Sequence, residues 1–558
     1  MMVDAIDELS DKGTKGISVA LNLAMGIDRE EIMDAAKDML ERLSTRPKVL
    51  TEVWQQFATE TAAIILGFSQ LDPSADKRFS DPAWLENPFY KRVAQYYMAW
   101  GHALEDWLDK SELEPMNDKR ARFLLHIMRD LIAPVNSLFG NPKAMKNLVD
   151  SRGESLVNGA RNFIDDLRHN YGYPAVADRN AFVIGKDVAA SKGSVIFRNE
   201  LLELIQYSPV TPKVHERPFM YVFSQVNRFY LGDLTLDRSL FQELMGAGIT
   251  VYAVSWRNPT IENRDWDLQT YAEAVIEGVD VIRAISGHEK INLMGLCAGG
   301  ITTGAAVGLL QAQGRDVINS HSLFVNILDN RPEDSDFGLF VSERSIEAQK
   351  ARINALGIFD EKEVFEMFAW LTPEESVMSF FRDNYLLGMK PPQHPLLFWS
   401  MDYTRVPAGL QCDYLDLAWY NKLAKKELRI AGKLIDLSQI TYDTYIMAGS
   451  TDHITPWRGC YRTAQLLGGN VEFVLTNQNH TQTISNKPNK HMKYWIAPNL
   501  PADSEEWIQQ AELYPGSWRE HWIAWLKQRS GDEVDAVETL GSADYMPIDR
   551  APGRYVLE

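Results

Sequence analysis

The sequence predicts an α/β protein with added helical regions, and three observations lead to that class. From about residue 190, short continuous apolar runs alternate with helical stretches, which is the pattern of strands buried on both faces of a parallel sheet. The residues before this point show helical periodicity, and the alternation stops again between about 330 and 435. We therefore expect a helical N-terminal domain over 1–185 and an α/β domain over 186–558, with a helical cap inserted at about 330–435.

Helical periodicity marks the N-terminal part of the chain. In the segment 27–44, IDREEIMDAAKDMLERLS, apolar residues recur at the spacing of a helix that buries one face. The segment 80–90, SDPAWLENPFY, is expected to be a loop, because its prolines cannot donate backbone hydrogen bonds. Its aromatic side chains are expected to dock on a core.

Seven apolar runs are expected to form the strands of the α/β domain. They cover residues 194–197, 219–224, 249–256, 291–295, 321–328, 443–449 and 471–476. A helical stretch at 268–286 lies between two of them, as a crossover between parallel strands requires. The stretch 330–435 is helical and aromatic, which is why we expect it to form a cap.

Composition and charge exclude several classes of protein. Hydrophobic residues make up 45% of the 558, so most of the chain is not disordered. The formal net charge of −19 argues against broad nucleic-acid binding, which needs a basic surface. The three cysteines form no disulfide framework, and the segment 1–16 contains no apolar signal sequence, so we expect a cytoplasmic protein.

One uncharged stretch has the length of a membrane helix. It consists of the 24 residues between Lys290 and Arg315. Clustered glycines and the polar residues Asn292, Thr302 and Thr303 interrupt it, and it has no aromatic belt. A strand, a turn and a buried helix explain the stretch better, so we expect no transmembrane segment.

The strongest chemical motif is Gly-Leu-Cys-Ala-Gly-Gly at residues 295–300. It follows an expected strand and opens an expected helix, as a G-x-S-x-G nucleophile elbow does, with cysteine in place of serine. The nucleophile of such a turn is crowded, so its neighbours must be small, and the helix N-terminus stabilises a thiolate or an oxyanion. A lone motif of this kind also fits a buried cysteine in a glycine-rich turn, so Cys297 needs partners before it can be assigned as a nucleophile.

Two residues downstream complete a candidate triad. In proteins with this elbow, the acid follows the nucleophile along the chain and the histidine comes last. Asp452 follows the strand expected at 443–449, and His480 follows the strand expected at 471–476. Each residue alone is better explained as part of a turn or loop, but three residues in this order, each at a strand end, favour catalysis. His453 is an alternative base, although it would have to fold back onto its neighbour.

The sequence contains no motif for a metal or a nucleotide cofactor. H-E-x-x-H and paired-cysteine motifs are absent, and so are the P-loop and dinucleotide-binding glycine patterns. We therefore expect an enzyme that uses neither a metal nor another cofactor.

Together, these motifs resemble the poly(3-hydroxyalkanoate) synthases of the one-subunit type, and more closely the medium-chain-length class. GLCAGG resembles the cysteine box of that family, and TDHITPW and NQNHTQTISNKP resemble its aspartate and histidine motifs. Further segments resemble the family in the same order along most of the chain: DPAWLENPFYKR, RNELLELIQY, VNRFYLGDL, VSWRNPT and LGGNVEFVLT.

The resemblance implies an α/β-hydrolase fold with a helical cap, and the polymerisation of (R)-3-hydroxyacyl-CoA into polyester with release of CoA. Cys297 would carry the acyl chain, His480 would be the general base and Asp452 its partner. Backbone N–H groups of Ala298 and of Val226, or of its neighbour Gln225, would stabilise the oxyanion. The resemblance also implies a homodimer in the cytoplasm, associated with the growing polyester and with the surface of a polymer granule.

The chain departs from the family pattern near the expected oxyanion loop. The family usually has a Pro-Pro pair, one further residue and then Ile-Asn-Lys where this chain has Ser224-Gln225-Val226-Asn227-Arg228, so the proline pair is missing. Asn479 stands where the family usually has glycine before the histidine. Asparagine tolerates the left-handed conformation that glycine would adopt, so Asn479 is compatible with the family geometry. We expect the missing prolines to affect the rate or the substrate range more than the fold.

The sequence leaves two other functions open. One is a cysteine-nucleophile esterase or depolymerase of the same fold, which would release CoA without forming polymer. The other is a non-catalytic granule-binding protein, which would release no CoA. We also expect some aromatic residues of the cap to line an apolar path for the polymer. They are Phe365, Phe368, Trp370, Phe380, Phe381, Phe398 and Trp399.

Overall fold

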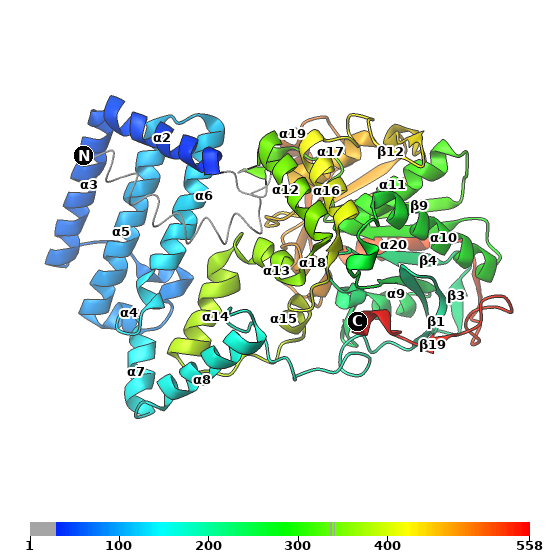
Figure 1. The fold of residues 1–558 in the computed structure, drawn as a ribbon, viewed down its shortest axis with the longest axis horizontal. Coiled ribbons are helices and arrows are strands. Elements are labelled where there is room, and N and C mark those ends of the chain that lie inside the picture. Colours follow the sequence, from blue (N-terminus) through cyan, green and yellow to red (C-terminus); the bar gives the residue numbers. More distant parts are fainter. Residues whose placement is uncertain (1–28, 335–337, 340) are drawn as a thin grey trace. The chain divides into compact units, whose positions relative to one another are not determined.

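The computed structural model describes residues 29–334, 338–339 and 341–558 (Figure 1). The acidic segment 1–16 and the first two residues of the helix expected at 27–44 lie outside the described residues. The rest of that helix is present as α2 (Arg29–Thr45).

The chain divides into two compact units. The first, called here the helical unit, comprises the residues up to Asp178, Leu339–Ser345 and Phe365–His394. The second, called here the sheet unit, comprises Arg179–Gly338, Ile346–Val364 and Pro395–Glu558. The stretch expected to form the cap therefore contributes to both units.

The helical unit is built mainly from helices, several of which begin at a proline. Its longer helices are α2, α3 (Pro47–Leu66), α5 (Pro88–Ser111), α6 (Pro115–Ile132), α7 (Pro142–Asp150) and α8 (Glu154–His169). Proline suits the first helical position, because the N–H of that residue has no acceptor within the helix. Asn87 caps α5 by accepting hydrogen bonds from the N–H groups of Phe89 and Tyr90.

The loop expected at 80–90 is only partly a loop. The short helix α4 (Ala83–Glu86) and the first turn of α5 fall within it. Its prolines start or precede helices, so the lost N–H groups do not prevent helix formation. Trp84 docks as expected: it is 1% exposed and its ring centroid lies 4.7 Å from that of Phe79. The expectation was wrong for Phe89, which is 64% exposed.

Residues 365–394 pack against the N-terminal helices. They contain the end of α13 (Glu361–Ala369), two π-helical turns, η8 (Glu374–Met378) and η9 (Arg382–Leu386), and the short α14 (Ser379–Phe381) between them. The hydroxyl of Tyr385 donates to Asp166 at 2.8 Å, and the side chain of Asn384 donates to the carbonyl of Ala175 at 2.8 Å.

The sheet unit is organised around an 11-stranded mixed sheet. Its order is β17-β16-β15-β14-β9-β8-β4-β7-β2-β1-β19. The six strands from β15 to β7 are parallel: β15 (Val471–Thr476), β14 (Asp443–Gly449), β9 (Ile318–Phe324), β8 (Ile291–Leu296), β4 (Phe219–Val222) and β7 (Val251–Trp256). The flanking strands are antiparallel: β1 (Gly193–Arg198), β2 (Leu202–Tyr207), β16 (Lys493–Ile496), β17 (Glu512–Pro515) and β19 (Asp549–Arg550).

Each of the seven expected strand regions contains a strand, but one orientation was wrongly expected. β1, from the run at 194–197, pairs antiparallel with β2. The connection between them is only three residues long, and so short a connection can join only antiparallel strands. Asn199 shapes this turn by accepting hydrogen bonds from the N–H groups of Leu201 and Leu202.

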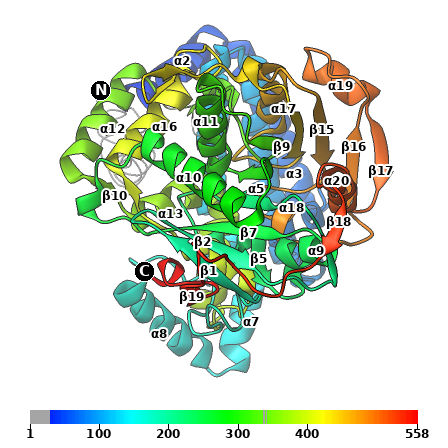
Figure 2. The ribbon, with the colours of Figure 1, turned by 90° about the vertical axis from the view of Figure 1, so that its right-hand side faces the viewer.

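Helices cover both faces of the sheet (Figure 2). The helices that accompany the sheet are α9 (Leu240–Gly246), α10 (Leu268–Ser286), α11 (Ala298–Ala312), α15 (Pro395–Ser400), α16 (Ala408–Tyr420), α17 (Trp457–Leu466), α18 (Gln482–Ser485), α19 (Ser504–Gln510) and α20 (Trp518–Lys527). The helix α12 (Glu343–Leu356) has residues in both units.

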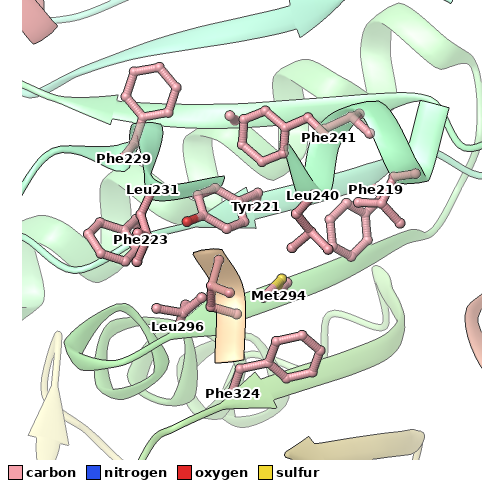
Figure 3. Packing of buried hydrophobic residues seen from close by; sticks show 14 of the residues in the cluster. Phe219, Tyr221, Phe223, Phe229, Leu231, Leu240, Phe241, Met294, Leu296 and Phe324 are labelled. Carbon is pink, nitrogen blue, oxygen red and sulfur yellow. The ribbon is translucent and has the colours of Figure 1, made fainter. Parts of the chain in front are cut away.

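Alternate residues of the central strands face opposite helical layers. Phe219 and Tyr221 of β4 lie in one core with Leu240 and Phe241 of α9 (Figure 3). The same core contains tryptophans of α20. Met220 points the other way, toward α10, where a Cβ on Gly278 would lie 2.8 Å from its methyl carbon. The strands are therefore buried on both faces, which explains their continuous apolar sequences.

The uncharged stretch between Lys290 and Arg315 forms β8, a turn and the buried helix α11, as expected. Glycine lets this helix approach its neighbours closely: a Cβ on Gly308 would lie 2.4 Å from Cγ2 of Ile435. Among the described residues, no helix combines the length and apolar character needed to cross a membrane.

A buried histidine in the sheet predicts a pH dependence of stability. His321 on β9 is 1% exposed, and burial lowers its pKa from 6.5 to about 3. The unfolded chain therefore takes up this proton first, and the contribution to stability is complete above pH 6.5 and declines as the pH falls toward 3.

We expect His321→Leu to reduce the loss of stability between pH 6.5 and 5 by up to about 2 kcal/mol. Thr303, which contacts Nε2 of His321, keeps a hydrogen bond to the carbonyl of Gly300. Urea unfolding at both pH values measures the effect, with His491→Leu at an exposed position as control. An equal loss in wild type and His321→Leu would contradict the assignment.

Candidate active site

The turn from β8 into α11 holds Cys297 in a strained conformation. Its backbone has φ 55° and ψ −132°, which non-glycine residues rarely adopt. Its N–H donates to the carbonyl of Phe324 at 3.0 Å, and its carbonyl accepts from Gly300 N at 2.9 Å and Asn326 Nδ2 at 2.8 Å. Three hydrogen bonds thus hold the cysteine in place at the start of a helix.

The glycines of the motif are required by space. A Cβ on Gly295 would lie 2.2 Å from Oγ1 of Thr303, and one on Gly299 would lie 2.5 Å from the carbonyl oxygen of Val222. A Cβ on Gly300 would lie 2.3 Å from the side chain of Asn326. A side chain at any of these three positions would clash with its surroundings, as expected for a crowded nucleophile elbow.

The candidate acid and base lie on the loops that follow β14 and β15. Nδ1 of His480 and Oδ2 of Asp452 are 2.7 Å apart, and the Asp452 side chain is fully buried. Cys297 lies close enough to His480 for its charge to affect the imidazole. The three residues singled out in the sequence therefore come together, and the imidazole paired with Asp452 is that of His480, which favours it over His453.

Electrostatics make His480 and Asp452 an ion pair. Burial alone would lower the pKa of His480, but Asp452 and Cys297 raise that pKa well above its usual value. Burial alone would raise the pKa of Asp452, but His480 and hydrogen bonds from Thr455 bring it below its usual value. The imidazolium is thus favoured while the acid stays ionised.

Thr455 is a site residue that the sequence analysis missed. Its hydroxyl donates to Oδ2 of Asp452 at 2.7 Å and lies 3.1 Å from Nδ1 of His480. Oδ1 of Asp452 accepts the backbone N–H groups of Ile454 and Thr455, both at 2.9 Å. A threonine three residues after an aspartate is a common turn pattern, and this was the available signal.

The two expected oxyanion donors differ in their surroundings. Ala298 is the first residue of α11, so its N–H has no acceptor within its own helix. The N–H of Val226 is engaged with Oγ of Ser224 at 3.2 Å. The side chain of Gln225 is buried and takes part in a separate network, described below.

The other two cysteines lie on helices and not at the elbow. Cys412 lies on α16 and Cys460 on α17, and burial raises the pKa of both thiols. In the described part of the chain, no three His, Cys, Asp or Glu side chains are grouped as a metal ion would require.

The sheet order, the strained cysteine turn and the paired aspartate and histidine define an α/β-hydrolase fold with a cysteine at the elbow. Comparison with known proteins agrees. Residues 230–486 match the family model described as "alpha/beta hydrolase fold", and residues 75–244 match "Poly-beta-hydroxybutyrate polymerase (PhaC) N-terminus".

Curated relatives extend the match to nearly the whole chain. Poly(3-hydroxyalkanoate) polymerase 1 of Ectopseudomonas oleovorans is 38% identical over 99% of both chains, and polymerase 2 of the same organism is 41% identical over 96% of both. The polymerase subunit PhaC of Cupriavidus necator is 34% identical over 93% of this chain and 90% of its own. The chain therefore belongs to the poly(3-hydroxyalkanoate) polymerase family of acyltransferases, which confirms the resemblance drawn from its motifs.

The contacts of Thr455 generate a prediction about the acid. We expect Thr455→Val to lower kcat for CoA release about threefold to tenfold, because one hydrogen bond to a charged carboxylate is lost. The same loss raises the pKa of Asp452, so the acid limb of the pH–rate profile should move to higher pH. Thr455→Ser keeps the hydroxyl and should stay near wild type. Equal behaviour of the Val and Ser variants would show that the hydroxyl has no such role.

Proposed function

We propose that the protein polymerises (R)-3-hydroxyacyl-CoA into polyester through an acyl chain carried on Cys297, and releases CoA. The observation that supports this most strongly is the strained cysteine at the elbow beside the His480–Asp452 pair, in a chain of the polymerase family. Transfer from the thiol of CoA to the thiol of cysteine is nearly isoenergetic, so the acyl group stays activated for the next step.

In the first step, His480 accepts the proton of the Cys297 thiol, and the thiolate attacks the thioester carbonyl of the substrate. The tetrahedral oxyanion is stabilised by the N–H of Ala298 and by that of Val226, once the carbonyl oxygen replaces Oγ of Ser224 as its acceptor. The C–S bond to CoA then breaks, and the CoA sulfur takes the proton from His480.

In the second step, the 3-hydroxyl of a second hydroxyacyl-CoA attacks the acyl-cysteine. His480 accepts the hydroxyl proton, and Asp452 holds the imidazole in the orientation that this transfer needs. An ester bond forms, and the Cys297 sulfur leaves as a thiolate and takes the proton from His480. The lengthened chain is then the acyl group of the second CoA, and a repeat of the first step returns it to Cys297 and releases that CoA. The polyester chain grows by one unit, and no cofactor enters this proposed scheme.

We further propose a preference for medium-chain substrates, because the segments DPAWLENPFYKR and GITTGAAVGLL resemble the medium-chain-length class of the family more closely. The other proposed properties are a homodimer, a cytoplasmic location at the surface of polymer granules, and domains at 1–185 and 186–558 with a cap at 330–435. A water-insoluble product and three free cysteines support the location.

The aromatic residues of the expected cap have different surroundings. Phe365 packs on Tyr173, with ring centroids 5.0 Å apart, within the helical unit. Trp399 packs on Phe223, next to the loop that follows β4, with centroids 6.0 Å apart. Of these two, Trp399 is the better candidate for a residue that shapes the path of the polymer.

The role of Cys297 can be tested against the other two cysteines. Cys297→Ala should abolish CoA release and polymer formation while circular dichroism stays unchanged, because the acyl acceptor is lost. Cys412→Ala and Cys460→Ala should retain most activity. Polymer formation by Cys297→Ala at a comparable rate would rule out the mechanism, and CoA release by wild type without polymer would favour an esterase.

The ion pair predicts how the cysteine reacts with an alkylating reagent. At pH 6, the protonated His480 beside Cys297 favours attack by the cysteine sulfur, whereas burial raises the pKa of Cys412 and Cys460. Iodoacetamide should therefore modify Cys297 first, as measured by peptide mass spectrometry. In His480→Gln, the rate at pH 6 should fall about tenfold or more and recover at higher pH. An unchanged rate would mean that His480 does not activate the thiol.

A further inference from the structure

The loop that follows β4 is held mainly by a distant part of the chain. This loop, residues 223–228, is expected to supply the second oxyanion donor. Thr404 donates its hydroxyl to the carbonyl of Gln225 at 2.6 Å and its N–H to the carbonyl of Val226 at 3.2 Å. The indole of Trp399 donates to the carbonyl of Arg228 at 2.8 Å.

The side chain of Gln225 adds a second set of contacts. It is 3% exposed, and its amide nitrogen donates to Oγ1 of Thr302 at 2.9 Å. Its amide oxygen accepts the hydroxyl of Tyr414 at 2.8 Å. One side chain therefore joins three elements: the loop after β4, the helix α11 that begins at the elbow, and the helix α16.

Both ends of this chain of hydrogen bonds lie beside the reactive cysteine. Thr302 is in the second turn of α11, and its hydroxyl reaches the carbonyl of Ala298 at 3.4 Å. Tyr414 is half-buried, and Cys297 is near enough for its charge to act on the phenol. These hydrogen bonds thus link Ala298, which carries one expected oxyanion donor, through Thr302 to Gln225. Gln225 directly precedes Val226, which carries the other donor.

The buried side-chain amide of Gln225 requires hydrogen-bond partners at fixed positions. A glutamine in this environment needs partners for both its oxygen and its nitrogen, because an unsatisfied buried polar group costs about 1–3 kcal/mol. The loop can keep the described position of Gln225 only while Tyr414 and Thr302 stay within hydrogen-bond distance. Displacement of α16 would release the loop from Tyr414 on one side.

We propose that Tyr414, Gln225 and Thr302 form a positioning device that sets the second oxyanion donor only when α16 is in the described position. The three are positioning residues, and acyl transfer is thereby coupled to the placement of the segment 395–420. The inference rests on the proposed roles of Cys297 and Val226.

The test is a double-mutant cycle on purified full-length protein. Gln225→Leu and Tyr414→Phe should each lower kcat for CoA release about tenfold or more, because a misplaced oxyanion donor weakens binding of the transition state. KM should change less than about threefold, since binding of the ground state is largely kept. The double variant should resemble the single variants, because the second change finds the hydrogen-bond chain already broken.

Conservative variants separate positioning from simple structural damage. Thr302→Ser keeps the hydroxyl and should retain kcat, whereas Thr302→Val keeps the shape and should lose it. Alkylation of Cys297 by iodoacetamide forms no oxyanion, so Gln225→Leu should be modified at least as fast as wild type. Tyr461→Phe is the matched control, because this buried tyrosine also donates to a carbonyl, that of Pro501, but lies on α17.

The outcomes distinguish this inference from the proposed function. Activity in Cys297→Ala would overturn the proposed function itself. If Cys297 is essential but the effects of Gln225→Leu and Tyr414→Phe multiply, or if kcat is unchanged in both, the coupling is wrong. Slower alkylation of Gln225→Leu, or equal losses in the two Thr302 variants, would also overturn it, because these results indicate general damage.

Discussion

The site depends on close packing of the turn around Cys297 against the neighbouring strand and helix. Cys297 keeps an unfavourable backbone conformation because the three neighbouring glycines let the turn press against β4, against Asn326 and against the start of α11. Strain of this kind persists only where the surrounding structure over-determines the position. The parallel sheet provides that rigidity, and its strand ends then determine where the aspartate and the histidine can stand.

The sequence was most informative where burial alone decides the structure. The six parallel strands are buried on both faces, so their apolar runs could be recognised without knowledge of their neighbours. The antiparallel strands β2, β16, β17 and β19 were missed, because all four contain charged residues, three of them have at most four residues, and their pairing depends on turns. The strand β2 even contains the charged Glu203, which is fully buried beside Arg198.

The sequence also could not show that the segment expected to form a cap is divided between the helical unit and the sheet unit. Helical periodicity shows that a segment buries one face, but it does not say against which core. The order of Cys297, Asp452 and His480 could be predicted, because strand ends in a parallel sheet share one edge. Thr455 and Asn326 escaped notice, and Gln225 was considered only for its backbone N–H. The roles of these side chains consist of hydrogen bonds to residues that the sequence does not reveal as neighbours.

The connection between β9 and β14 has a consequence for how such proteins can diversify. The two strands are hydrogen-bonded neighbours, although more than one hundred residues separate them along the chain. Their pairing fixes the ends of this connection, so the material between them can change without altering the sheet register. Recombination between relatives at these two junctions would exchange α16 and the segment around Trp399 as one block. Because that block also binds the loop after β4, a working chimera needs a compatible residue at position 225 as well.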